Sequence, residues 1–252
     1  MQDLNKISRL DHMAKEISLS GKADMRSLSL RYGVSIDTIR RDIKELHEKG
    51  VLEATRGGAV SRAPVSRSFR ERLQVDIEEK RMIARKAISL ISAGQLIVLC
   101  GGTSIVSLAM ALPSDLPFTV VTNNFPVITA LEDHTMVEVL FAGGRVSRTH
   151  NNTTGTLSSG FFKSIRPDIF FIAPSGIHSD AGITSSDFEH ANMEREIVKN
   201  ARKVVALVTT SKLNTEENFK ICDLSEIDMM ITELDPNDAR LATYQSPYFE
   251  LL

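Results

Sequence analysis

The sequence has few cysteines and no long apolar run. Only two of its 252 residues are cysteines, Cys100 and Cys222, and they lie far apart and outside any metal-ligand spacing. This argues against a disulfide scaffold, a zinc site or another cofactor, and it predicts two reduced, buried thiols. Apolar runs such as 96–99 are far shorter than the roughly 20 residues that a membrane span requires. The first residues also lack the apolar core of a secretion signal, so we expect a cytoplasmic protein without a membrane partner.

Charge is distributed unevenly along the chain, although the formal net charge is only −2. Residues 1–72 contain 15 of the 30 Lys and Arg but only 10 of the 32 Asp and Glu, so the remainder has 15 basic against 22 acidic residues. A basic N-terminal part on an acidic body is typical of a polyanion-binding module joined to a second domain. The length fits two domains of unequal size.

The first 60 residues show the pattern of a helix-turn-helix. Apolar residues at three- and four-residue steps predict helices over 4–17, 24–31 and 35–49. Gly33 can supply the positive φ of a tight turn, and Ser35 stands where a helix N-cap is expected. The third helix has a predicted inward stripe of Ile36, Ile39, Ile43 and Leu46.

A basic hairpin is predicted after the third helix. Residues 51–54 and 59–60 flank Arg56-Gly57-Gly58, which indicates a wing with a basic tip. The candidate DNA contacts are the polar residues that face away from the stripe, together with the wing arginine: Ser35, Thr38, Arg40, Arg41, Lys44 and Arg56. The alternative is a solvated helix face whose cations pair with nearby acids. The order of glycine turn, capped basic helix and hairpin favours binding to a double-stranded DNA operator.

Several of these residues resemble the DeoR-type family of bacterial transcriptional regulators: Val34-Ser35, Thr38-Ile39-Arg40-Arg41-Asp42-Ile43, Leu46, Gly50, Leu52 and Gly57-Gly58-Ala59. The resemblance implies that the third helix is the recognition helix and that Ser35, Thr38, Arg40 and Arg41 meet DNA. Asp42 is interpreted as orienting neighbouring basic side chains. Ala54 departs from the family, which usually has Arg there, and Arg56 is our candidate for supplying that charge.

The rest of the chain predicts a parallel α/β domain. Residues 61–75 have linker composition, and a helix is predicted over 77–92. Beyond residue 94, short apolar runs alternate with helical stretches, the pattern of parallel strands joined by crossover helices. Strands are predicted at 96–100, 118–122, 137–141, 168–173, 203–209 and 228–232, and helices at 104–112, 125–133, 156–166, 189–201 and 237–244. The fold class is therefore α/β, with a small N-terminal winged helix-turn-helix domain (1–60) and a larger Rossmann-like parallel-sheet sensor domain (76–252).

Small polar residues follow the predicted strands. Ligands of open parallel sheets bind at the carboxyl ends of the strands, where glycines let backbone amides approach an anion. A lysine there can pair with phosphate. The candidate effector residues are Gly101, Gly102, Thr103, Ser104, Thr122, Asn123, Gly143, Gly144, Arg145, Ser175, Gly176, His190, Arg195 and Lys212. Ordinary turn chemistry is the alternative, but the repetition of such loops at one sheet edge favours a small anionic or polyhydroxylated ligand.

The family resemblance continues through the body and covers nearly the whole chain. The family's sensor domain is similar to the fold of ribose-5-phosphate isomerase and commonly recognises phosphorylated sugars, which implies a sugar phosphate effector. Cys100, His190 and Thr209 stand where the family usually has carboxylates, and Arg195 stands where Lys is common. Because the anion loops remain while these acids are gone, we hypothesise an unusual ligand with fewer hydroxyls or more negative charge.

The favoured function is a DNA-binding transcriptional regulator, a repressor of a carbohydrate-metabolism operon that responds to a phosphorylated sugar or other small anionic metabolite. One alternative is a sugar-phosphate isomerase-like enzyme with an accessory DNA-binding head. The missing carboxylates disfavour it, because isomerisation needs a positioned base, and we expect no enzymatic activity. Another alternative is a regulator with a degenerate effector pocket. A homodimer or homotetramer on repeated half-sites is expected.

Overall fold

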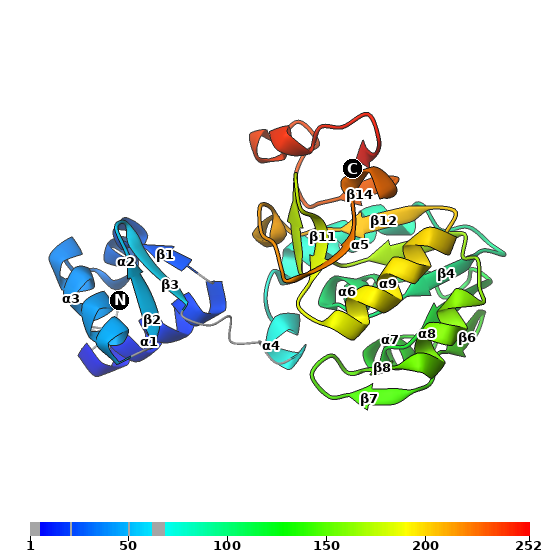
Figure 1. Cartoon of the computed structure of the whole chain (residues 1–252), viewed down its shortest axis with the longest axis horizontal. Coiled ribbons are helices and arrows are strands. Elements are labelled where there is room, and N and C mark those ends of the chain that lie inside the picture. The colour runs from blue at the N-terminus through cyan, green and yellow to red at the C-terminus, as the bar shows by residue number, and fades with distance from the viewer. Residues whose placement is uncertain (1–5, 21, 50, 62–68) are drawn as a thin grey trace. The chain divides into compact units, whose positions relative to one another are not determined.

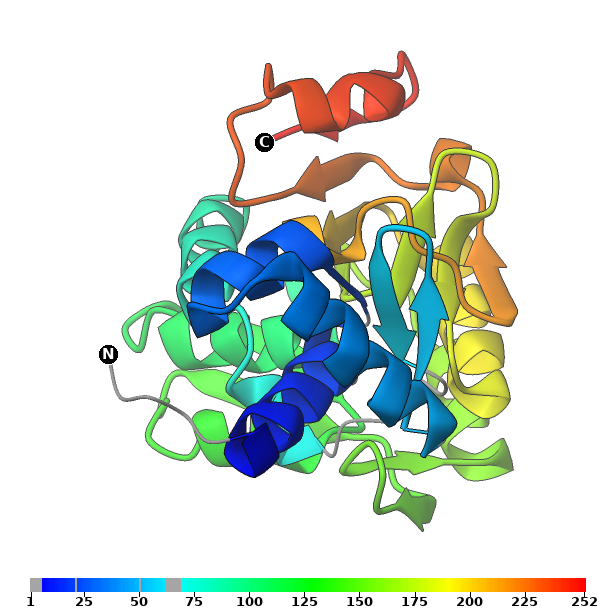
Figure 2. The same ribbon diagram turned by 90° about the vertical axis from the view of Figure 1, so that its left-hand side faces the viewer.

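The computed structural model describes residues 6–20, 22–49, 51–61 and 69–252, and the chain divides into two compact units, Met1–Ser68 and Phe69–Leu252. Figures 1 and 2 show the smaller unit from two sides, with its helices in blue and its hairpin in lighter blue. Its described elements are, in chain order, α1 (Lys6–Ser20), β1 (Lys22–Asp24), α2 (Met25–Tyr32), α3 (Ile36–Glu48), β2 (Leu52–Thr55) and β3 (Gly58–Ser61).

Local capping residues set the bounds of α2 and α3. The Asp24 carboxylate accepts a hydrogen bond from the Ser27 amide at 2.9 Å, and Ser35 Oγ accepts one from the Thr38 amide at 3.2 Å. Between these caps, Gly33 adopts a φ of 64° and ends α2. A residue with a Cβ takes this left-handed conformation only with strain. The predicted glycine turn and serine N-cap are therefore confirmed.

The core of the smaller unit is built by the inward faces of the helices and by β2 and β3. It buries Leu10, Met13, Ile17, Leu28, Ile39, Ile43, Leu46, Leu52 and Ala59. Ile36 is an exception, because 42% of this residue is exposed. The expectation that Ile36 belongs to the inward stripe is wrong, since the buried face of α3 begins one turn later at Ile39.

A buried ion pair joins α1 to α3. Arg9 Nε donates to Asp42 Oδ2 at 2.7 Å and its Nη2 donates to Oδ1 at 3.3 Å, so both carboxylate oxygens are bound. Asp42 is 2% exposed and Arg9 is 9% exposed. Asp42 therefore holds a basic side chain, as expected, but that side chain is Arg9 of α1 and not one of the arginines of α3.

The wing is a three-stranded antiparallel sheet in the order β1-β3-β2. β3 is its central strand, with Ala59 opposite Ala23 on one side and Ala54 on the other. The predicted hairpin is confirmed. β1 was not predicted, because three residues are too few to show an alternating pattern.

The larger unit has many more elements. They are α4 (Phe69–Leu73), α5 (Ile77–Ile88), β4 (Leu96–Leu99), α6 (Thr103–Ala111), β5 (Phe118–Thr122), α7 (Phe125–Ala130), β6 (Val137–Phe141), β7 (Arg145–Ser147), β8 (Asn152–Thr154), α8 (Thr156–Lys163), β9 (Ile169–Ile172), β10 (Gly176–His178), β11 (Gly182–Ser185), α9 (Phe188–Asn200), β12 (Val204–Leu207), β13 (Phe219–Cys222), β14 (Met229–Ile231), β15 (Glu250–Leu251) and the 3-10 turns η1 (Thr210–Lys212), η2 (Leu224–Glu226) and η3 (Ala239–Tyr244).

A parallel sheet lies between two helical layers in the larger unit. Successive residues of β4 face opposite layers: Ile97 and Leu99 pack with α5, α6 and α7, whereas Val98 packs with α8 and α9. Strands buried on both faces give the continuous apolar runs seen in the sequence. In Figure 1, α9 lies in front of this sheet.

The strand order across the larger sheet is β15-β14-β12-β9-β4-β5-β6, and every neighbouring pair is parallel. β4 and β9 are neighbours at its centre. The chain runs outward from β4 through β5 to β6, but outward in the other direction from β9 through β12 to β14. In open parallel sheets, ligands bind beyond the carboxyl ends of the strands where the chain reverses in this way, here those of β4 and β9.

Several elements of the larger unit differ from the sequence prediction. The segment 61–75, predicted as a linker, contains α4, because Phe69 is buried in the core beside α6. The helix predicted over 237–244 is the 3-10 turn η3. The antiparallel sheet β10-β11-β13 and the hairpin β7–β8 were missed, because their strands are three or four residues long and bounded by polar residues.

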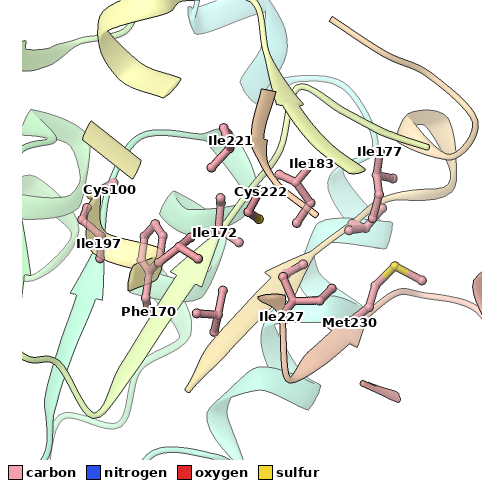
Figure 3. Packing of buried hydrophobic residues seen from close by; sticks show 14 of the residues in the cluster. Cys100, Phe170, Ile172, Ile177, Ile183, Ile197, Ile221, Cys222, Ile227 and Met230 are labelled. Atoms are coloured by element: carbon pink, nitrogen blue, oxygen red, sulfur yellow. The ribbon is translucent and has the colours of Figure 1, made fainter. Parts of the chain in front are cut away.

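Cys100 and Cys222 are buried free thiols, as predicted. Both lie in the apolar cluster that joins the large sheet to α9 and to the β10-β11-β13 sheet, where Figure 3 shows them with Ile177, Ile183 and Ile221. Burial raises the pKa of Cys100, and the nearby Glu194 charge raises it further. Among the described residues, no helix is long and apolar enough to cross a membrane.

Removing one half of the Arg9–Asp42 pair tests its structural role. Asp42→Ala leaves a buried, unpaired guanidinium, so we expect the free energy of unfolding of the smaller unit to fall by about 3–5 kcal/mol. Denaturant-dependent hydrogen exchange of α3 amides in the full chain measures this change. The double variant Arg9→Met, Asp42→Leu removes both charges and should recover most of the lost stability. A loss below about 1 kcal/mol for Asp42→Ala, the range of exposed pairs, would contradict the assignment.

Candidate functional site

The N-terminal end of α3 presents hydroxyl groups on the surface of the smaller unit. Ser35 is exposed at the N-cap, and its Oγ lies 2.9 Å from Thr38 Oγ1, within hydrogen-bond distance. Backbone amides of the first helical turn point in the same direction as the helix N-terminus, where the partial positive charge favours an anion. This end of α3 therefore combines side-chain donors with a favourable electrostatic potential for phosphate.

The predicted cationic residues of α3 and the wing are all exposed. Arg40 forms an ion pair with Asp37, one turn before it, and Lys44 Nζ lies 3.9 Å from Glu48 Oε1. Arg41 has no ion pair with any residue that the structure describes, and Arg56 occupies the turn between β2 and β3. The solvated pairs of the alternative interpretation thus exist at Arg40 and Lys44, while Arg41 is the cation of α3 left available to an external anion.

Gly101 directly follows β4, at the carboxyl end of this central strand. A Cβ atom built on Gly101 would lie 3.1 Å from Cε1 of His190 and 3.5 Å from Nδ2 of Asn152. The absence of a side chain at Gly101 therefore allows α9 and β8 to approach the end of β4. His190 and Asn152, which are far apart in sequence, meet here.

Buried polar side chains gather around this point. Asn123, Asn152 and Glu194 are each at most 1% exposed. Asn123 Nδ2 donates to the Thr153 carbonyl at 2.7 Å, but its Oδ1 has no hydrogen-bond partner among the described residues. The same is true of both amide atoms of Asn152, of His190 Nδ1 and of Glu194 Oε1. We call Asn123, Asn152, His190 and Glu194 the polar cluster.

His190 and Glu194 are charge partners on one face of α9. Nε2 of His190 lies 3.1 Å from Oε1 of Glu194, within ion-pair distance, and apart from this contact Oε1 has no hydrogen-bond partner among the described residues. Burial lowers the pKa of His190, but Glu194 and Asp187 outweigh burial, so the pKa of His190 is raised above its ordinary value. The ring of His150 stacks on that of His190, with centroids 5.9 Å apart. Burial, His190 and Arg72 lower the pKa of His150 to about 4.

Glu194, Asn152 and His150 were missed by the sequence analysis. Glu194 lies one helical turn beyond His190, so the i, i+4 spacing on the predicted helix was the available signal. Asn152 and His150 lie in and beside the unpredicted β7–β8 hairpin, whose three-residue strands are too short to show an alternating pattern. A buried carboxylate is therefore present, although none remains at the three family positions occupied by Cys100, His190 and Thr209.

Other predicted effector residues lie at the same edge of the sheet. The Thr122 hydroxyl is buried and accepts the Asn124 amide at 3.0 Å, and Lys212 lies in η1 after β12. The remainder are distributed over the loops: Gly102, Thr103 and Ser104 at the start of α6, Gly143 and Gly144 before β7, and Ser175 and Gly176 after β9.

Two predicted arginines are engaged elsewhere. Arg195 donates to the Ile221 carbonyl at 3.3 Å and to the Lys220 carbonyl, so its guanidinium binds β13 rather than the polar cluster. Arg145 pairs at 2.5 Å with Glu189 on the rim of a hollow of about 300 Å³. Asp187 also lines this hollow and accepts the His190 amide at 2.8 Å, which places the hollow beside the polar cluster. The described residues contain no group of three or more His, Cys, Asp or Glu side chains suited to a metal.

A winged helix-turn-helix joined to an α/β unit with a buried polar cluster near its strand ends is the architecture of a ligand-responsive DNA-binding protein, and family comparisons agree. Residues 9–65 match the DeoR-like helix-turn-helix domain, and residues 75–234 match the DeoR C terminal sensor domain. The chain belongs to the DeoR family of transcriptional regulators.

Relatives with similar sequences are named as regulators. The chain is 33% identical over 208 residues to the HTH-type transcriptional repressor GlcR of Bacillus subtilis, covering 82% of this chain and 80% of that one. It is 29% identical over 254 residues to the lactose phosphotransferase system repressor of Staphylococcus epidermidis, covering 99% and 100%. These names, like the matching domains, describe regulators of transcription and not enzymes.

Solved structures with a related arrangement include ribose 5-phosphate isomerase A from Methanocaldococcus jannaschii. The sequence identity is 16%, the TM-score is 0.41, and the match covers 55% of each chain. A likeness this distant carries no conclusion about activity.

The charge coupling in the polar cluster predicts how His190 titrates. An NMR titration of the full chain should give His190 a pKa above the ordinary value of about 6.5 and His150 a pKa of about 4. In Glu194→Gln, burial becomes the dominant influence, so the pKa of His190 should fall below about 6.5. The matched control is Glu189→Gln, an exposed acid one residue before His190, which should change it little. A His190 pKa that stays raised in Glu194→Gln would contradict the pairing.

The same shifts set the sign of two opposing effects on stability. Because its folded pKa is raised, His190 stabilises the folded unit fully below its unfolded pKa of about 6.5 and loses this contribution as the pH rises through the folded pKa. The depressed pKa of His150 gives a contribution that is present above about 6.5 and lost as the pH falls through about 4.

Proposed function

We propose that this protein represses a carbohydrate-metabolism operon, binds its operator through α3 and the wing, and is controlled by a phosphorylated sugar or another small anionic metabolite bound beyond the carboxyl ends of β4 and β9. The polar cluster is the observation that supports control by an anionic metabolite. The protein acts as a homodimer or homotetramer, because one short recognition helix contacts too few base pairs for specific recognition.

The operator contacts are assigned to the exposed polar side of α3. Ser35 and Thr38 contact phosphate or base edges from the helix N-terminus, and Arg41 reads a base or a phosphate in the major groove. Arg40 and Lys44 exchange weak surface ion pairs for contacts with DNA, and Arg56 extends from the wing tip. Each exchange is feasible because exposed pairs contribute only about 0–1 kcal/mol.

The effector site is assigned from unmet hydrogen-bonding capacity. A buried polar atom without a partner destabilises a protein by about 1–3 kcal/mol, so several in one place indicate a site shaped for a polar ligand. The Asn123 Oδ1 and Glu194 Oε1 atoms can accept hydrogen bonds from ligand hydroxyls, and Asn152 Nδ2 can donate one. The proposed partners of the ligand's anionic end are protonated His190, the glycine loops and Lys212.

The names of relatives support a sugar-derived effector. Besides the lactose phosphotransferase system repressor, they include the glycerol-3-phosphate regulon repressor of Escherichia coli. Glu194 supplies the carboxylate that the three altered family positions lack. The ligand therefore retains at least one hydroxyl donor for Glu194, which narrows the earlier hypothesis of a ligand with fewer hydroxyls.

Replacing Arg41 tests the assignment of α3. Arg41→Ala should weaken binding to an operator fragment, first identified by footprinting upstream of the protein's own gene, by roughly tenfold to a hundredfold if the side chain reads a base. Fluorescence anisotropy at several salt concentrations measures the affinity. Arg81→Ala is the matched control, because it removes an exposed helical arginine of the other unit, where Arg81 pairs with Glu78. Equal affinities of Arg41→Ala and Arg81→Ala would overturn the recognition-helix assignment.

A ligand screen tests the polar cluster. Thermal shift measurements with a panel of sugar phosphates should find one that stabilises the full chain, by about 2.7 kcal/mol at one hundred times its Kd. Asn152→Ala should abolish that shift, whereas Asn237→Ala, an exposed asparagine whose side chain bonds Asp235, should retain it. If no member of the panel stabilises the protein and its operator affinity is the same in every metabolite extract, the effector pocket is degenerate.

A further inference from the structure

A hydrogen bond ties the loop after β12 to the segment that enters the larger unit. Ser211 Oγ donates to Asp76 Oδ2 at 2.6 Å, across 135 residues of sequence. Ser211 belongs to η1, the turn that contains Lys212. Asp76 stands between α4 and α5, and α4 is the first described element of the larger unit after the DNA-binding unit along the chain. We call the Asp76–Ser211 bond the clasp.

Asp76 is held in an unusual conformation. Its φ is 51° and its ψ is 45°, the left-handed region that residues with a Cβ rarely adopt. It occupies the N-cap position of α5, where a residue normally has extended backbone angles and its carboxylate accepts a first-turn amide. Here no side-chain cap bond forms. Asp is one of the few residues with a Cβ that visit this region, and here its carboxylate accepts the Ser211 hydroxyl and not a first-turn amide.

Asp76 therefore has two alternative partners. With the clasp closed, its carboxylate accepts the Ser211 hydroxyl and its backbone is left-handed. With the clasp open, the same carboxylate can cap the first turn of α5, and the backbone can take the extended angles usual for an N-cap. The change in φ redirects the chain that enters α5 and so moves α4. Lys80 Nζ donates to the carbonyl of Arg72 at 2.7 Å and to that of Val75, so these two bonds across Asp76 must rearrange when the chain direction changes.

An anion at the loop competes for the same donor. A serine hydroxyl has a single proton to donate, so Ser211 bonds either Asp76 or an oxygen of the anion. A second carboxylate, Glu233, accepts the Thr210 amide at 2.9 Å and the Thr210 hydroxyl, so the neighbouring donors of the loop are held by a carboxylate as well. A phosphate bound near Lys212 would also repel the Asp76 carboxylate.

We propose that Asp76 is displaced from Ser211 when the anionic effector binds, and that its release changes the chain direction at α4 and transmits effector binding toward the DNA-binding unit. This inference rests on the proposed function, which places the anionic end of the effector at the loop containing Lys212. It adds the element through which occupancy of the site reaches the rest of the chain.

Hydrogen exchange of the full-length protein tests the clasp, with inorganic phosphate as the probe and chloride at equal ionic strength as the reference. In the wild type, phosphate should slow exchange over 209–212 and accelerate it over 70–76. Asp76→Gly removes the carboxylate and suits the positive φ. Without phosphate, exchange over 70–76 should already be about fivefold faster in this variant, the ratio for losing one hydrogen bond worth about 1 kcal/mol, and phosphate should add nothing.

Two further variants separate the parts of the clasp. Ser211→Ala should accelerate exchange over 70–76 as Asp76→Gly does. Asp76→Asn keeps an acceptor and tolerates the left-handed conformation but carries no charge, so phosphate should accelerate exchange over 70–76 less than in the wild type. An Asp76→Asn response equal to that of the wild type would overturn the competition between charges.

The possible outcomes distinguish a failure of the clasp from a failure of the proposed effector site. Protection of 209–212 by phosphate with no change over 70–76 would overturn the clasp and leave the anion site standing. No protection of 209–212 would overturn the placement of the anion at this loop, and the clasp mechanism with it. Unchanged exchange over 70–76 in both Asp76→Gly and Ser211→Ala would overturn the clasp whether or not phosphate binds.

Discussion

Burial of β4 and β9 on both faces fixes where chemistry can occur in the larger unit. Ile97 and Leu99 contact one helical layer and Val98 the other, so a shift of one residue in register would exchange the two apolar faces. The two strands lie side by side, and the chain leaves them in opposite directions across the sheet. The reversal point at their carboxyl ends follows from this topology, and the missing side chain of Gly101 lets His190 and Asn152 approach it closely.

Each unit contains a buried pair of opposite charges, and the two pairs differ in how many of their polar atoms are hydrogen-bonded. In the smaller unit, both carboxylate oxygens of Asp42 are bound by Arg9, and nothing is left for an external partner. In the larger unit, Glu194 and His190 lie close together, but Glu194 Oε1 and His190 Nδ1 lack hydrogen-bond partners among the described residues. Buried polar atoms that lack partners are costly, which is why we propose a ligand as the missing partner in the larger unit.

The features that the sequence predicted are those with a local cause. Ser35, Gly33 and the apolar runs of the central strands each act within a few residues, so the recognition helix and the parallel sheet could be predicted. The polar cluster depends on contacts between α9, β8 and the end of β4. It could not be predicted, because β8 is too short to show a periodic pattern in the sequence. Phe69 placed a helix within a segment of linker composition, since one buried aromatic residue is enough to anchor it. The prediction that Ile36 is buried was wrong, because the spacing of an apolar stripe does not show at which residue its buried part begins.

The central position of β3 in the wing sheet bears on how the protein would meet DNA. Because β3 is hydrogen-bonded on both sides, the hairpin is braced by β1, and β1 joins α1 to α2. Arg56 therefore projects from a framework that is ordered before any encounter with a duplex. Little conformational entropy would be lost at the hairpin on association, which would favour the proposed contact of Arg56 with DNA.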